Sequence, residues 1–216
     1  MMNILCFGDS NTYGHIPGSG DRYDETKRWT KLLQKHLGQD YYVIEEGLNG
    51  RTTVFEDPYT NNLRGIDLLE TCIATHQPLD LVILMLGTND IKPRFNVGPD
   101  GIARGLECLL KKLRNPMVYH KDVLVVSPIH IGESIMESEF CEMFGGRRGI
   151  EISKQLSRRY EEFADLYNCH FLDAAKIAQP DERDGVHLGE EGHSLLAKAL
   201  FEKVKEIEKR LVTYKL

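Results

Sequence analysis

Three polar segments far apart in the sequence carry residue types that together could hydrolyse an ester. They are Gly8-Asp9-Ser10, Gly87-Thr88-Asn89-Asp90 and Asp184-Gly185-Val186-His187. A serine hydrolase needs a hydroxyl nucleophile, an imidazole that takes its proton, a carboxylate that holds the imidazole, and donors for the oxyanion. Each requirement has a candidate here, so the sequence suggests serine-based acyl chemistry.

Ser10 is the candidate nucleophile, with His187 as its base and Asp184 as the carboxylate that orients the base. Asp184 precedes His187 by three residues in a glycine-containing turn, a spacing that can bring the carboxylate to Nδ1 and leave Nε2 for the serine proton. Taken singly, the serine could be a helix N-cap and the other two could be ordinary loop residues. A metal site would recruit His193 or Glu190, but His193 fits the exposed or interfacial side of the last predicted helix, so we expect no metal.

The candidate oxyanion donors are the Asn89 amide and the backbone N–H of Gly50. Gly50 lacks a side chain, so its N–H could approach a ligand closely. The alternative for Asn89 is a helix cap or an Asx turn, a role that Asp90 could share. A phosphate-binding loop is also conceivable after the first strand, but Asp9 would place a carboxylate where the phosphate should lie, and no nucleotide-loop motif occurs.

The residues around Ser10 are candidates for the wall of a substrate pocket. Asp9 and Asn11 flank the serine, and Tyr13 and His15 follow in the same short segment. The other histidines are interpreted as structural, although His15 is close enough to Ser10 to line the pocket; they are His15, His36, His76, His120, His130 and His170.

Short apolar runs alternate with helical patterns along the whole chain. We expect strands at 4–7, 41–44, 81–86, 123–126 and 170–172, and helices at 29–37, 63–75, 102–113, 152–167 and 190–211. This alternation predicts an α/β fold, a single domain over residues 1–216 with a parallel sheet and helices on both faces. Because parallel sheets place their sites at the carboxyl ends of the strands, the polar segments should meet at one edge.

Residues 129–150 fit neither pattern. Large apolar side chains lie there among glycines and polar residues: Ile131, Ile135, Met136, Phe140, Met143 and Phe144. They could cover the pocket, pack on their own subunit or form an interface, and we expect a lid or contact loop that supports a homo-oligomer.

Composition excludes several other classes of function. The net charge of −6 gives no reason to expect a nucleic acid or a membrane as partner. The five cysteines show no C-x-x-C spacing, which suggests neither a disulfide framework nor a zinc site. Because the first residues lack a basic region and a long apolar run, we expect a cytoplasmic protein.

In order and spacing, Gly8-Asp9-Ser10, Gly50, Gly87-x-Asn89-Asp90 and Asp184-x-x-His187 resemble the four blocks of the SGNH (GDSL-type) esterases. Stretches such as Arg51-Thr52-Thr53 are similar to the bacterial arylesterase/acyltransferase subgroup. The resemblance implies a flavodoxin-like three-layer α/β/α sandwich with a five-stranded parallel sheet. It also implies a Ser10-His187-Asp184 triad and an oxyanion hole made of the Ser10 N–H, the Gly50 N–H and the Asn89 amide.

Together these observations predict a serine esterase that hydrolyses short-chain acetyl or aryl esters through an acyl-serine intermediate, with acyl transfer as a further activity. It should need no cofactor, and its partner should be a small ester. Two alternatives are an O-acetylesterase acting on carbohydrates or natural products, and a non-catalytic binding domain that keeps the fold.

Overall fold

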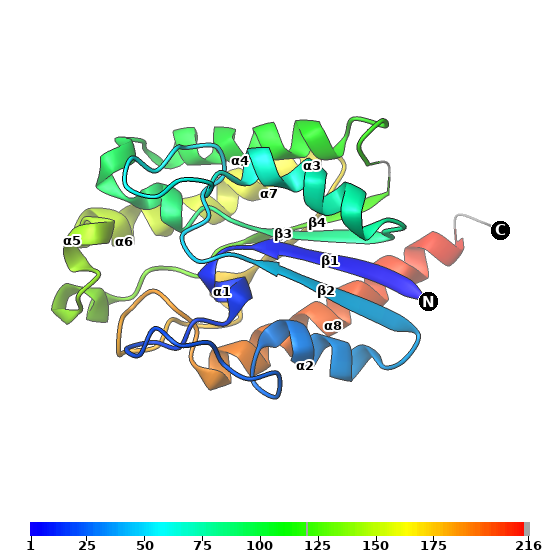
Figure 1. Cartoon of the computed structure of the whole chain (residues 1–216), viewed down its shortest axis with the longest axis horizontal. Helices are drawn as coiled ribbons and strands as arrows, with labels where there is room; N and C mark the ends of the chain where they lie inside the picture. The colour runs from blue at the N-terminus through cyan, green and yellow to red at the C-terminus, as the bar shows by residue number, and fades with distance from the viewer. Residues whose placement is uncertain (120, 214–216) are drawn as a thin grey trace.

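The computed structural model describes residues 1–119 and 121–213. Its strands form one parallel sheet in the order β2-β1-β3-β4-β5 (Figure 1). The strands are β1 (Met2–Gly8), β2 (Tyr41–Gly47), β3 (Leu81–Met85), β4 (Asp122–Ser127) and β5 (His170–Asp173). The chain is thus an α/β protein with a five-stranded parallel sheet, as the sequence predicts.

Helices cover both faces of the sheet, which explains why the central strand β3 is apolar at every position (Figure 1). One face packs against α3 (Gly65–His76), α4 (Pro99–Leu113) and α7 (Leu156–Leu166), and the other against α2 (Trp29–Leu37) and α8 (Glu190–Thr213). Successive strand residues point to opposite faces. Leu5 and Phe7 therefore join the first core, while Ile4 and Cys6 join the second.

The segment 129–150 is mostly helical rather than a loop. It contains the 3₁₀ turn η3 (Glu133–Glu137) and the short helices α5 (Cys141–Phe144) and α6 (Arg147–Ser153). Ile131, Ile135 and Phe144 are buried in the same core as the sheet. Packing within the chain therefore accounts for these apolar residues, whereas Met136 and Met143 remain 40% exposed.

The helix expected at 152–167 is interrupted, because α6 ends at Ser153 and α7 begins at Leu156. The Ser153 hydroxyl donates to the Ile150 carbonyl (2.7 Å) and accepts from the Ile131 N–H (3.0 Å). A serine hydroxyl that binds nearby backbone competes with the helical hydrogen bonds. This serine thereby joins the segment after β4 to the end of α6.

The carboxyl ends of the strands meet at one edge, where the chain changes direction in the sheet. After β1 it moves to β2 on one side, and then crosses to β3 on the other side of β1. Such a switch point is where open parallel sheets bind ligands. The short elements there are α1 (Ser10–Tyr13), η1 (Asn89–Ile91), η2 (Pro93–Phe95) and η4 (Ala174–Lys176). No helix among the described residues is long and apolar enough to cross a membrane.

Candidate active site

Ser10 is the first residue of the short helix α1, directly after β1. The N-cap is Asp9, whose carboxylate accepts the Asn11 N–H at 3.0 Å, so the serine is not needed as a cap. Gly8 allows this tight turn, because a Cβ at that position would lie 2.1 Å from the Thr12 hydroxyl oxygen and 2.8 Å from the Met85 carbonyl oxygen. The turn leaves the Ser10 hydroxyl free to meet a distant partner.

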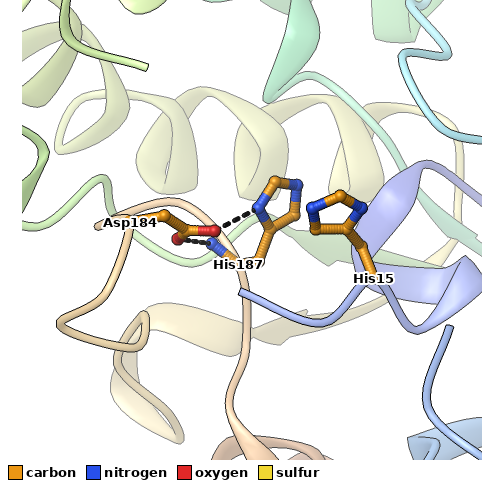
Figure 2. A group of neighbouring side chains, drawn as sticks. All are labelled: His15, Asp184 and His187. Atoms are coloured by element: carbon orange, nitrogen blue, oxygen red, sulfur yellow. Dashed lines mark hydrogen bonds and ion pairs between the residues drawn. The ribbon is translucent and has the colours of Figure 1, made fainter. Parts of the chain in front are cut away.

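That partner is His187, which joins Ser10 and Asp184 in one row. The distance from Ser10 Oγ to His187 Nε2 is 2.9 Å, and that from His187 Nδ1 to Asp184 Oδ2 is 2.7 Å. All three side chains are buried. Figure 2 shows the carboxylate of Asp184 facing both the ring and the backbone N–H of His187. The carboxylate therefore favours the tautomer that carries its proton on Nδ1 and leaves Nε2 as an acceptor.

Asp184 stays ionised despite its burial. Burial alone would raise the pKa of its carboxyl, but the hydrogen bond and charge of His187 outweigh it and hold the pKa below the ordinary value. The other oxygen, Oδ1, accepts the Val186 N–H (2.8 Å) and the His187 N–H (2.9 Å). A fixed negative charge beside Nδ1 would stabilise an imidazolium that forms when His187 takes a proton.

Asn11 fastens the His187 loop to the helix that carries Ser10. Its amide oxygen accepts the Leu188 N–H (2.8 Å), and its amide nitrogen donates to the Val186 carbonyl (3.3 Å). These two groups lie on either side of His187 in the chain. The carbonyl of Asn11 accepts the Trp29 indole N–H at 3.0 Å. Asn11 therefore acts as a clamp in the structure, and a role in lining the pocket stays a prediction.

The candidate oxyanion residues lie at the same edge, connected through Arg51. The Asn89 amide donates one hydrogen to the Arg51 carbonyl (3.1 Å), which leaves its second hydrogen for a ligand. The Arg51 guanidinium donates to the carbonyls of Gly8 (2.9 Å) and Glu46. Gly50 has a φ of 81°, a left-handed conformation that suits glycine. Arg51 thus joins the ends of β1 and β2 to the turn η1 that carries Asn89.

Asp90 does not cap a helix as the sequence alternative suggested. Its carboxylate accepts the N–H (2.9 Å) and the hydroxyl of Thr53, and so joins the loop after β3 to the loop after β2. Burial raises the pKa of Asp90 to about 6. Asp9 is also fully enclosed, and burial raises the pKa of its carboxyl. Through these hydrogen bonds, Asp9 and Asp90 hold the backbone around the site in place.

His15 packs against the ring of His187, with centroids 4.1 Å apart (Figure 2). Burial, reinforced by the charge of His187, lowers the pKa of His15 to about 4, so this ring is neutral at neutral pH. Its Nδ1 finds no hydrogen-bond partner in the described part of the chain. Tyr13 lies on the outer side of α1, where the Arg22 guanidinium stacks 4.5 Å from its ring centroid.

His15, Asp184 and His187 could hold a metal ion by distance alone, because one donor atom from each lies within 4.8 Å of the others. However, both oxygens of Asp184 already accept hydrogen bonds, and both ring nitrogens of His187 face a partner. Binding a metal would break these contacts. The donor set fits proton transfer better than metal coordination.

The expected exposure of His193 was wrong, because the side chain is 0% exposed beneath α2. Its Nδ1 accepts the Trp29 N–H at 3.3 Å, and its ring stands edge-on to Tyr23. His193 lies in the first turn of α8, where this helix packs against α2, so its side chain points inward. The periodicity of the α8 sequence alone did not indicate this orientation. Two of the other histidines pair with acids, His76 with Glu46 and His170 with Asp122, and His120 lies outside the described residues.

Sequence reasoning missed the positions of two further side chains. Phe140, expected in a lid or an interface, stands edge-on to His187 with centroids 5.5 Å apart. Lys92 is enclosed close behind Asn89, although lysines are seldom buried. The only signal for Lys92 was its place between Ile91 and Pro93, three residues after Asn89.

Comparison with known proteins identifies the family. The model of the GDSL-like lipase/acylhydrolase family matches residues 6–195. The chain belongs to this family. Its fold matches that of the M. smegmatis aryl esterase with a TM-score of 0.88 and 38% identity, over 95% of this chain and 99% of that one.

Two acetylesterases are also similar to this GDSL-family chain. A carbohydrate acetylesterase from Sinorhizobium meliloti is 38% identical with a TM-score of 0.87, over 96% of this chain and 100% of that one. The acetylxylan esterase of Xylanibacter ruminicola is 24% identical over 230 residues, which cover 94% of this chain and 43% of that protein. The chain therefore spans less than half the length of the latter relative. The family and these esterases make the chain a carboxylic-ester hydrolase with the SGNH hydrolase fold.

Proposed function

We propose that this GDSL-family hydrolase is a serine esterase that cleaves short-chain acyl esters through an acyl-serine intermediate. The observation that carries the proposal is the unbroken row from Ser10 Oγ through His187 to Asp184, with steps of 2.9 and 2.7 Å. In this row each atom is already within hydrogen-bonding distance of the atom with which it would exchange or share a proton.

In the first half of the reaction, Ser10 Oγ attacks the ester carbonyl while its proton passes to Nε2 of His187. The carbonyl oxygen becomes an oxyanion, which the N–H groups of Ser10 and Gly50 and the free amide hydrogen of Asn89 would stabilise. When the tetrahedral intermediate collapses, the carbon–oxygen bond to the alcohol breaks. His187 returns its proton to the leaving alkoxide, so the products are the alcohol and acyl-Ser10.

In the second half, a water molecule replaces the alcohol. His187 takes a proton from the water as it attacks acyl-Ser10, and then returns that proton to Ser10 Oγ as the carboxylic acid leaves. An alcohol in place of water would give acyl transfer, the second activity that we propose for this site. Hydrolysis and transfer therefore differ only in the nucleophile that reaches the acyl-enzyme.

The acyl group should be small, because aromatic rings crowd His187. His15 stacks at 4.1 Å from it and Phe140 stands edge-on at 5.5 Å, both measured between ring centroids. We therefore propose acetyl and similar short esters as substrates. An acetylated carbohydrate is the second candidate, supported by the similarity to the Sinorhizobium meliloti carbohydrate acetylesterase.

Ser10→Ala tests the proposal directly. We expect it to reduce the hydrolysis of 4-nitrophenyl acetate by about 10⁴-fold or more, because members of a triad act as a unit. The exposed residue Ser19 supplies the matched control, Ser19→Ala, which should keep normal turnover. A fluorophosphonate should add its mass to the wild type and to Ser19→Ala but not to Ser10→Ala. Normal turnover by Ser10→Ala would refute the proposal, while an unlabelled and inactive wild type would favour a binding domain.

A further inference from the structure

Lys92 is an enclosed cation next to the candidate oxyanion residue Asn89. The residue is 6% exposed, and its N–H donates to the Asn89 carbonyl at 3.3 Å. Its own carbonyl accepts the Phe95 N–H at 3.1 Å, so the backbone is fixed between the 3₁₀ turns η1 and η2.

No carboxylate in the described part of the chain forms an ion pair with Lys92. Among the acids, Asp57 has the largest charge effect on the pKa of Lys92, but its carboxylate is paired with Arg94 at 2.6 Å. Asp9 and Asp90 also act on the ammonium through their charge, but neither forms an ion pair with it, because Asp9 caps α1 and Asp90 accepts from Thr53. An enclosed ammonium without a direct ion pair costs folding free energy. Such a cost is expected where a ligand supplies the missing charge.

Aromatic side chains connect this ammonium with His187. Lys92 Nζ lies 5.5 Å from the centroid of the Phe144 ring. The centroids of Phe144 and Phe140 are 6.2 Å apart, and Phe140 stands 5.5 Å from His187. Lys92 and His187 therefore lie at opposite ends of one row of packed aromatic rings, in which Phe144 is buried and Phe140 is partly buried. A substrate held at Ser10 could extend past Phe140 toward the ammonium.

We propose that Lys92 binds a carboxylate carried by the ester substrate, in its acyl chain or in its alcohol. This inference rests on the proposed esterase function and narrows its substrate class. Burial, with repulsion from Arg94 in support, lowers the pKa of Lys92 to about 8, so the ammonium form still prevails at neutral pH. A single ammonium suits one carboxylate, whereas phosphate sites commonly add arginine forks or several backbone N–H groups.

Two sets of matched esters test whether the substrate carries the carboxylate in its acyl chain or in its alcohol. For the acyl arm, 4-nitrophenyl hemiesters of the short diacids succinate and glutarate are compared with the corresponding esters whose terminal carboxylate is a neutral primary amide. For the alcohol arm, 4-acetoxybenzoate is compared with 4-acetoxybenzamide. We expect the wild type to prefer the anion of at least one pair by about 10-fold or more in kcat/KM, the size expected for one charge-assisted hydrogen bond.

Lys92→Met should abolish this preference by raising KM for the anion, with kcat and the neutral esters nearly unchanged. The variant should fold, because it removes an uncompensated charge and keeps a flexible apolar stem. Lys111→Met, at an exposed lysine on α4, is the control for net charge and should keep the preference. Equal use of anionic and neutral esters by the wild type, or an unchanged preference in Lys92→Met, would overturn the inference.

A failure of the esterase proposal gives a different result, because the wild type would then hydrolyse no ester, neutral or anionic. In that case, calorimetric titration of the Ser10→Ala protein with the same hemiesters decides the question. Binding that Lys92→Met weakens by about 10-fold would still support the carboxylate site. Equal affinity with and without Lys92 would refute it.

Discussion

Replacing Asn11 by alanine should weaken catalysis although this side chain touches none of the reacting atoms. The amide of Asn11 holds the loop on both sides of His187, through the Val186 carbonyl and the Leu188 N–H. Asn11→Ala removes both contacts at once. The backbone of the loop keeps its hydrogen bonds to Asp184, so the loop should stay folded. The distance from the His187 ring to Ser10 should, however, no longer be fixed.

The magnitude follows from the two buried groups that lose their partner. A buried donor or acceptor left unsatisfied costs about 1–3 kcal/mol, so the loss of two partners in Asn11→Ala should destabilise the fold by about 2–6 kcal/mol. A shift of the base by about 1 Å can cost about 10²-fold in rate. We therefore expect kcat to fall by about 10²-fold while KM changes little.

The assay combines urea unfolding with steady-state hydrolysis of 4-nitrophenyl acetate. Leu109→Ala is the control, because it removes a fully buried side chain in α4 and should cost a similar 2–5 kcal/mol without affecting kcat. If Asn11→Ala loses stability but keeps its kcat, the clamp does not position His187. If KM rises instead, Asn11 contacts the substrate.

Two further predictions concern a polar donor and a buried base. Asn89→Ala should lower kcat by about 10²–10³-fold with little change in KM, because the amide acts on charge that is absent from the ground state; a higher KM at constant kcat would make Asn89 a binding residue. Burial lowers the pKa of His193 to about 3, below its unfolded value of 6.5, so the stability from its neutral form is present above pH 6.5 and is lost as the pH falls toward 3. Between pH 7.5 and pH 5, the wild type should lose about 2 kcal/mol more unfolding free energy than His193→Gln. Urea unfolding of both proteins at these two pH values measures the difference, and equal losses would refute the argument.

The sequence by itself determined the order of the elements and the residue types of the site. Continuous apolar strands such as 81–86 require cover on both faces, so they predict a parallel sheet between two helix layers without knowledge of any contact. Ser10 and Asn89 lie within a few residues of strand ends, and the strand ends of a parallel sheet share an edge. Asp184 and His187 are close in sequence, so their contact is local.

Tertiary structure decided which of these polar atoms have partners and which are enclosed. The sheet order puts β1 between β2 and β3, and only this order brings Arg51 between Gly8 and Asn89. His193 is buried because α2 packs on the start of α8, and Lys92 is enclosed because the segment with Phe144 folds over it. Burial and pairing depend on groups supplied by distant segments, and local periodicity contains no information about those neighbours.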